Sequence, residues 1–102
     1  MATVAHRCKQ TLADYYGKRL EGLVLFGSAA RGDAGRESDL DLLVLLKQPL
    51  DYFHELRAIS DLLYPLQLES DRLISAKPAS ADDFERGSSQ LYRNARREGV
   101  RL

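Results

Sequence analysis

The stretch LEGLVLFGSAARGDAGRESDLDLLVLL, residues 20–46, decides the fold because it places two apolar segments on either side of a polar connection. Leu20–Phe26 and Leu40–Leu46 are short, rich in Leu and Val, and followed by Gly27 and Pro49. Each segment therefore predicts a largely buried strand. Residues 27–38 between them contain three glycines and several charged side chains, which is typical of a functional connection rather than of core.

The segments before and after the two strands have the sequence features of helices. Residues 3–19 place apolar side chains at three- and four-residue steps, which predicts an amphipathic helix ending near Gly17. After the second strand, Asp51 can cap a helix that runs to about Tyr64 and that Pro65 is expected to end. A third strand is expected at Arg72–Lys77.

The C-terminal third predicts two more helical segments. Ser80 followed by Asp82 and Asp83 is typical of a helix start, and a last helix is expected from about Ser88 to Gly99. This order of elements favours an α/β (α+β) domain with one small mixed sheet and helices on one face, spanning residues 1–102 as a single domain.

Composition narrows the possible functions. The chain has 102 residues with 15 Lys plus Arg against 15 Asp plus Glu, so net charge does not indicate nucleic acid, although such a partner stays possible. The single cysteine, Cys8, cannot form an internal disulfide, which favours a cytoplasmic location. The longest apolar run, Leu42–Leu46, is far too short to span a bilayer, so we expect no membrane association.

Residues suited to phosphate and metal chemistry surround the polar connection. A strand that ends directly in Gly27-Ser28 leaves backbone N–H groups at the strand end, where they suit an anionic phosphate. Asp39 and Asp41 lie two positions apart at the start of the second strand, so their carboxylates project from one face, ~6.5 Å apart along it. Two such carboxylates repel each other unless a cation lies between them, and oxygen ligands beside a phosphate suit Mg²⁺.

In this order, LFGSAARG (residues 25–32) and SDLDL (residues 38–42) resemble the signature of the nucleotidyltransferase superfamily that includes DNA polymerase beta. Spacing and length are most similar to the minimal nucleotidyltransferases, small prokaryotic proteins that often act as antitoxins beside a HEPN-domain partner. The resemblance implies that Gly27 and Ser28 hold the terminal phosphates of a nucleoside triphosphate. It also implies that Asp39 and Asp41 bind two Mg²⁺ ions, and that Arg31 holds the loop or meets phosphate.

The resemblance also implies a reaction and a partner. We expect transfer of a nucleoside monophosphate from a triphosphate, with ATP as the expected donor, to a macromolecular hydroxyl on a protein tyrosine or an RNA end. The expected partner is a HEPN-domain protein of a toxin–antitoxin pair or, as a homodimer, a second copy of the chain. Aromatic and Arg side chains dominate interface energies, so the expected contact surfaces are Tyr52, Phe53, Tyr92 and the basic run Arg93 to Arg97.

The chain departs from the family pattern at a third carboxylate. Active members carry an acid on the following strand, whereas the centre of that strand here reads LISA (residues 73–76). Glu69 and Asp71 precede it and reach the site only if the strand starts earlier, and on that basis Glu69 joins Asp39 and Asp41 as a candidate catalytic residue. Alternatively, Ser75 occupies the third-acid position and the chain is a catalytically impaired nucleotide-binding or partner-binding module of the same fold.

Overall fold

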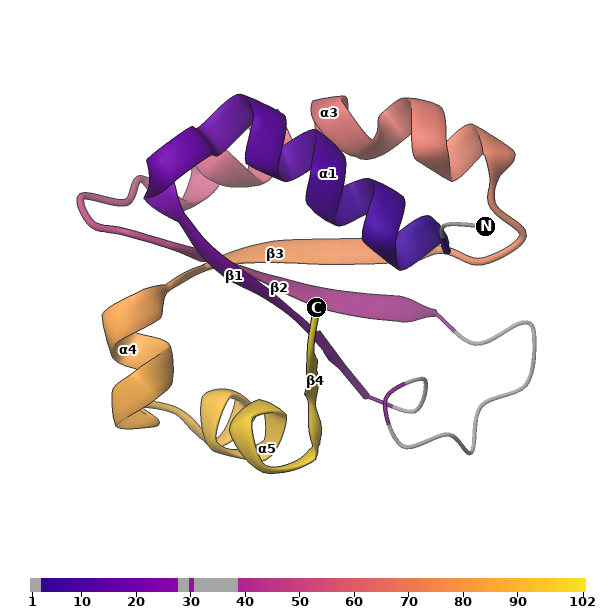
Figure 1. The fold of residues 1–102 in the computed structure, drawn as a ribbon. Coiled ribbons are helices and arrows are strands. Elements are labelled where there is room, and N and C mark those ends of the chain that lie inside the picture. The colour runs from indigo at the N-terminus through magenta and orange to yellow at the C-terminus, as the bar shows by residue number, and fades with distance from the viewer. Residues whose placement is uncertain (1–2, 28–29, 31–38) are drawn as a thin grey trace.

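Four strands form one mixed sheet in the computed structural model, which describes residues 3–27, 30 and 39–102 (Figure 1). β1 (Leu20–Phe26) pairs antiparallel with β2 (Leu40–Leu46), and β2 pairs parallel with β3 (Ile74–Ser80). The short β4 (Val100–Arg101) pairs antiparallel with β1, so the order across the sheet is β3-β2-β1-β4. The bounds of β1 and β2 confirm the two predicted strands.

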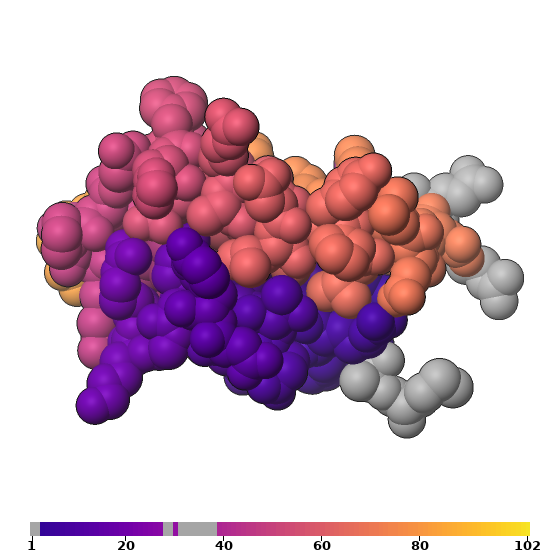
Figure 2. Space-filling view, turned by 90° about the horizontal axis from the view of Figure 1, so that it is seen from above, coloured from indigo at the N-terminus to yellow at the C-terminus, as the bar shows by residue number. Residues whose placement is uncertain are grey.

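Two long helices cover one face of the sheet. α1 (Val4–Tyr16) begins at Thr3, whose hydroxyl accepts a hydrogen bond from the backbone N–H of His6, and it is followed by a single 3₁₀ turn, η1 (Gly17–Arg19). α3 (Tyr52–Glu69) lies beside α1 on this face (Figure 2). Because side chains alternate along a strand, one set of β2 residues meets these helices. The buried core here consists of Cys8, Leu12, Tyr16, Leu23, Leu42, Val44, Leu46, Ile59, Leu63 and Leu66.

Two short helices cover the opposite face, so the expectation that all helices pack on one face is wrong. α4 (Ala81–Arg86) contributes Phe84, and α5 (Gln90–Glu98) contributes Ala95 (Figure 1). The physical reason lies in β2, where Leu42–Leu46 is apolar at every position and therefore needs cover on both faces. The second core consists of Val24, Leu43, Leu45, Ala79, Phe84 and Ala95.

Two predicted boundaries differ from the structure. Pro65 does not end the central helix but lies inside α3, where it is exposed to solvent. Proline has no backbone N–H to donate within the helix, and at an exposed position water can donate this hydrogen bond instead. Leu63 and Leu66, on either side of Pro65, are buried against the sheet. Their burial stabilises a helix that continues past the proline. As a result, the third strand begins at Ile74 rather than Arg72 and extends to Ser80.

A buried polar cluster joins the two long helices. Glu55 of α3 is 5% exposed, and its Oε1 accepts a hydrogen bond of 2.9 Å from the Tyr16 hydroxyl of α1. Its Oε2 accepts a hydrogen bond of 3.0 Å from Arg19 NH2 in η1. Both carboxylate oxygens are therefore satisfied, as a buried charge requires. Across residues 3–27, 30 and 39–102, no helix is long and apolar enough to cross a membrane.

Candidate active site

The candidate site forms at the end of the sheet where β1 ends and β2 begins. Antiparallel pairing places Phe26, the last residue of β1, directly opposite Asp41. Gly27 follows with a φ of +76°, and a Cβ built there would lie 2.6 Å from Asp41 Oδ2. The left-handed backbone favours glycine at this position, and a side chain here would displace the Asp41 carboxylate. The predicted proximity of Gly27 to the aspartate pair is thus present in the structure.

Asp41 lies on the face covered by α4 and α5, close enough to Asp39 for the two charges to interact. Asp41 is two positions from Leu43, which belongs to the core on that face, so its side chain points to the same side. Asp41 is half-buried and Asp39 is exposed. Burial raises the pKa of Asp41 above its ordinary value, the charge of Asp39 raises it further, and Lys77 partly opposes both effects.

This electrostatic arrangement fits a divalent cation. Two carboxylates that destabilise each other's charge gain free energy when a cation binds between them, and both offer the oxygen ligands that Mg²⁺ prefers. Within the described residues, no group of three or more His, Cys, Asp or Glu side chains is placed to hold a metal ion. Mg²⁺ typically binds one or two carboxylates and completes its coordination with water and substrate phosphates.

The neighbouring strand β3 presents Ser75 and Lys77 to the site. In the parallel register Ser75 is opposite Asp41, and Lys77 is opposite Leu43. Register partners in a sheet project to the same face, so both β3 side chains share the face of Asp41. The strand thus offers a hydroxyl and an ammonium group beside Asp41 where a third acid was sought.

The structure does not bring Glu69 to this site, which corrects its prediction as a third carboxylate. The prediction required the third strand to start early, but β3 starts at Ile74 and Glu69 is the last residue of α3. Its carboxylate forms an exposed 2.8 Å ion pair with Arg7 on the face opposite Asp41. Asp71 lines a separate cavity of about 450 Å³ beside α1 and is likewise not part of the Asp41 cluster.

Two other predicted site residues, Ser28 and Arg31, lie outside the described residues. Of the candidate interface residues, Tyr52 and Phe53 are 41% and 78% exposed. Tyr92 instead packs edge-on against Phe84, with ring centroids 6.2 Å apart, so it belongs largely to the core of the α4–α5 face.

Helix α5 contributes residues that the sequence analysis did not assign to the site. A cavity of about 180 Å³ next to Gly27 is lined by α5 side chains that include Asn94 and Glu98. Asn94 and Glu98, like Lys77, were not predicted, because in this segment only Tyr92 and the basic run Arg93 to Arg97 indicated a function. A signal was present, because Leu91, Asn94 and Glu98 recur at three- and four-residue steps on one helix face.

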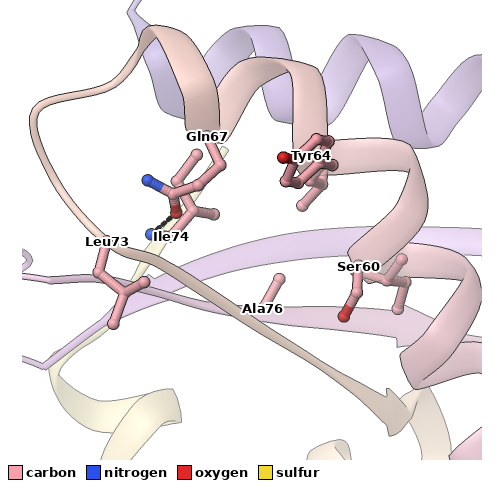
Figure 3. Close-up of a pocket in the computed structure, with 8 residues that line it drawn as sticks. Ser60, Tyr64, Gln67, Leu73, Ile74 and Ala76 are labelled. Carbon is pink, nitrogen blue, oxygen red and sulfur yellow. Dashed lines mark hydrogen bonds between the residues drawn. The ribbon is translucent and has the colours of Figure 1, made fainter.

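Another cavity, of about 230 Å³, lies between α3 and the outer edge of β3 (Figure 3). Its lining is mainly apolar, and the Gln67 side-chain oxygen accepts a 2.7 Å hydrogen bond from the backbone N–H of Ile74. This bond uses the backbone N–H of Ile74 at the edge of the sheet, and Pro78 further along β3 has no backbone N–H. The cavity lies on the α1–α3 side and does not adjoin the aspartate pair.

Comparison with known proteins identifies the family. The model of the nucleotidyltransferase domain matches residues 6–91. A candidate protein adenylyltransferase of Methanocaldococcus jannaschii, MJ0604, is 34% identical over 89 residues, covering 86% of this chain and 83% of its own length. A second candidate protein adenylyltransferase of the same organism, MJ0141, is 36% identical over 67 residues, covering 66% of this chain and 67% of its own.

A solved structure shares the fold. The crystal structure of a mutant of the toxin-antitoxin complex MntA-HpeT contains a chain that superimposes with a TM-score of 0.63 at 22% identity. The match covers 95% of this chain and 69% of that one. The mixed sheet, the Gly27–Asp41 contact and the family match over residues 6–91 lead to one conclusion. The chain belongs to the nucleotidyltransferase domain family and is an enzyme of the class that transfers nucleotidyl groups.

Proposed function

We propose that the chain is a Mg²⁺-dependent protein adenylyltransferase that modifies a hydroxyl of a partner protein. In this reaction the hydroxyl oxygen forms a bond to the α-phosphorus of ATP, and the bond from that phosphorus to the β-phosphate oxygen breaks. Pyrophosphate leaves, and the hydroxyl proton passes to solvent. The acceptor gains adenosine monophosphate through a phosphodiester bond.

The contact between Gly27 and Asp41 is the single observation that carries the proposal. It places a backbone without a side chain, suited to close approach by phosphate, against a carboxylate suited to a metal ion. Gly27 and Ser28 are assigned to the terminal phosphates, and Arg31 to the loop or to phosphate. For Ser28 and Arg31 the support is the family resemblance of residues 25–32.

Asp39 and Asp41 are assigned to the metal. Their mutual repulsion and the partial burial of Asp41 favour binding of Mg²⁺ at this end of β2. When bound, Mg²⁺ neutralises charge on the phosphates and on the departing pyrophosphate and assists deprotonation of the acceptor. Lys77 places a positive charge on the same face, where it can bind phosphate oxygens directly.

The acceptor class is inferred from relatives. Both Methanocaldococcus proteins are described as candidate protein adenylyltransferases, which supports ATP as donor and a protein as acceptor. The structural neighbour was solved as part of a toxin-antitoxin complex, which supports a toxin as the modified protein. We infer a HEPN-domain toxin with an acceptor tyrosine, in line with the resemblance to minimal nucleotidyltransferases.

Radiolabel transfer tests the function. The chain is incubated with ATP labelled at the α-phosphate, Mg²⁺ and the protein encoded by the neighbouring gene, with Asp41→Asn as matched control. We expect label on the partner protein, lost with Asp41→Asn and with a chelator, and located on a tyrosine by mass spectrometry.

Two outcomes distinguish the alternatives. Mg²⁺-dependent ATP binding without transfer to any partner would favour the impaired module, for which Ser75 opposite Asp41 is the relevant observation. Label on RNA ends instead of protein would replace the acceptor class while leaving the nucleotide site unchanged.

A further inference from the structure

A cavity beside the aspartate pair has no role in the function proposed above. It measures about 180 Å³ and lies between the end of β1 and α5, which runs beneath that strand (Figure 1). One wall contains Phe26, the register partner of Asp41, and Gly27, whose backbone approaches the Asp41 carboxylate. The cavity therefore opens directly next to the proposed phosphate and metal site, on the same face of the sheet.

The other wall is one face of α5. Leu91, Asn94, Ala95 and Glu98 recur at three- and four-residue steps and all line the cavity. Ala95 is 2% exposed and packs in the core beneath β1, which fixes the position of the helix. Leu91 and Phe26 supply apolar surface, whereas Asn94 and Glu98 supply polar groups.

Two neighbours orient the Asn94 amide. Its Oδ1 accepts hydrogen bonds from Gln90 Nε2 at 2.9 Å and from Arg97 NH2 at 3.2 Å. With the oxygen occupied, the amide nitrogen is the group that can donate to a molecule in the cavity. Arg97 Nη2 also lies 3.5 Å from Glu98 Oε1, so the same guanidinium contacts both the amide and the carboxylate.

This combination matches the chemistry of a nucleobase. A base presents flat apolar faces together with an edge on which acceptors and donors alternate. On adenine an acceptor ring nitrogen lies beside the N6 amine, which pairs with an amide donor next to a carboxylate acceptor. The corresponding edge of guanine presents two acceptors, N7 and O6, and would place O6 against the carboxylate.

We propose that this cavity is the nucleobase subsite of the enzyme and that Asn94 is a specificity-determining residue for adenine. Asn94 Nδ2 donates to a ring nitrogen, and Glu98 accepts from the N6 amine, while Phe26 and Leu91 contact the faces of the ring. The proposal rests on the proposed function, because it assumes that the triphosphate binds at Gly27 and the aspartate pair.

Calorimetric titration of the full chain with Mg²⁺ tests the proposal. The ligands are the non-hydrolysable α,β-methylene analogues of ATP, GTP, CTP and UTP, and inorganic tripolyphosphate. We expect the ATP analogue to bind at least about tenfold more tightly than the other analogues and tripolyphosphate. Asn94→Leu, similar in size but without the donor, should weaken the ATP analogue about three- to tenfold and leave tripolyphosphate unchanged.

Arg96→Gln is the matched control. Arg96 lies on α5 but lines a different cavity, so its loss should change the affinity of every analogue by the same factor. Asn94→Ser provides a second variant should Asn94→Leu fail to give the wild-type circular dichroism spectrum, and it should lower the ATP preference in the same way.

Each of the other outcomes would contradict a specific part of the proposal. Nucleotides that bind no better than tripolyphosphate, or an ATP preference unchanged by both Asn94 variants, would overturn the subsite. A GTP preference that depends on Asn94 would overturn the adenine assignment. If neither the analogues nor tripolyphosphate bind, the proposed function fails together with the subsite.

Discussion

Asp41 carries a charge that costs free energy in the absence of metal, because burial and Asp39 both raise its pKa. Asp41→Asn preserves the shape of the side chain and removes that cost. We expect the metal-free variant to melt at a higher temperature than the metal-free wild type, because the disfavoured charge is gone. We expect ATP with Mg²⁺ to stabilise the wild type but not the Asp41→Asn variant. A lower melting temperature of the metal-free variant would contradict the assignment of Asp41 to a metal site.

Ser75 lies opposite Asp41 on β3, so a carboxylate placed there would join Asp39 and Asp41. We expect Ser75→Asp to raise Mg²⁺ affinity about tenfold and to lower the stability of the metal-free chain, because a third negative charge is added. Ser75→Asn has nearly the same size without the charge and should change neither. Mg²⁺ affinity is measured by calorimetry, and equal affinities of the two variants would refute the position assigned to Ser75.

At the scale of elements, Glu55 connects α3 to α1 and η1 through its bonds to Tyr16 and Arg19. Glu55→Ala would leave the Tyr16 hydroxyl without its acceptor in the core. We expect a loss of about 2 kcal/mol in the free energy of unfolding, since Arg19 is partly exposed and recovers water contacts. Urea denaturation monitored by circular dichroism measures the change.

Glu69→Gln is the control for this experiment. The pair of Glu69 with Arg7 is exposed on both sides, so its loss should cost less than about 0.5 kcal/mol. Because the structure places Glu69 away from Asp41, the same variant should retain wild-type transfer activity. A large loss of activity would restore Glu69 as a catalytic candidate.

The buried thiol of Cys8 in α1 makes the free energy of unfolding depend on pH in the alkaline range. Cys8 is 0% exposed, and burial raises the pKa of its thiol from 9.0 to about 11. The unfolded thiol loses its proton near pH 9 while the folded one keeps it, so stability is complete below pH 9 and falls up to pH 11. The maximum loss is about 3 kcal/mol. Urea denaturation between these values should show a shallower slope for Cys8→Ala than for the wild type, and equal slopes would contradict the burial of the thiol.

For the molecule as a whole, the relevant feature is a pair of exposed aromatic residues at the start of α3. Phe53 is 78% exposed, and its ring meets that of Tyr52 edge-on at 5.3 Å between centroids. We expect this pair to contact a second copy or a partner protein, because aromatic side chains dominate interface energies. Light scattering should show association that Phe53→Arg weakens. Leu68→Arg, at the far end of the same helix and 69% exposed, is the control. A monomer at high concentration with no co-purifying protein would contradict the prediction.

The two central strands and part of the candidate site, Gly27 and Asp41, were predictable from the amino-acid sequence alone. Leu20–Phe26 and Leu40–Leu46 were predictable because a short apolar segment bounded by Gly or Pro is a local signal. Asp39 and Asp41 were predicted as a pair from the alternation of side chains along a strand, whereas β2 begins at Leu40 and Asp39 lies just before it. Gly27 was predictable from the motif formed by residues 25–32 and 38–42, which can be recognised in the sequence without knowledge of the packing.

The surroundings of that site depend on how the layers of the fold pack together. Pro65 remains within α3 because Leu63 and Leu66 gain more from burial than one lost backbone bond costs, and this balance depends on the sheet beneath them. The late start of β3 then places Ser75 rather than Glu69 beside the aspartate pair. The cavity of Asn94 and Glu98 forms because β2 is apolar on both faces and recruits α5 to the second one. These contacts join residues far apart in the chain, and their free energies arise only when the layers pack together.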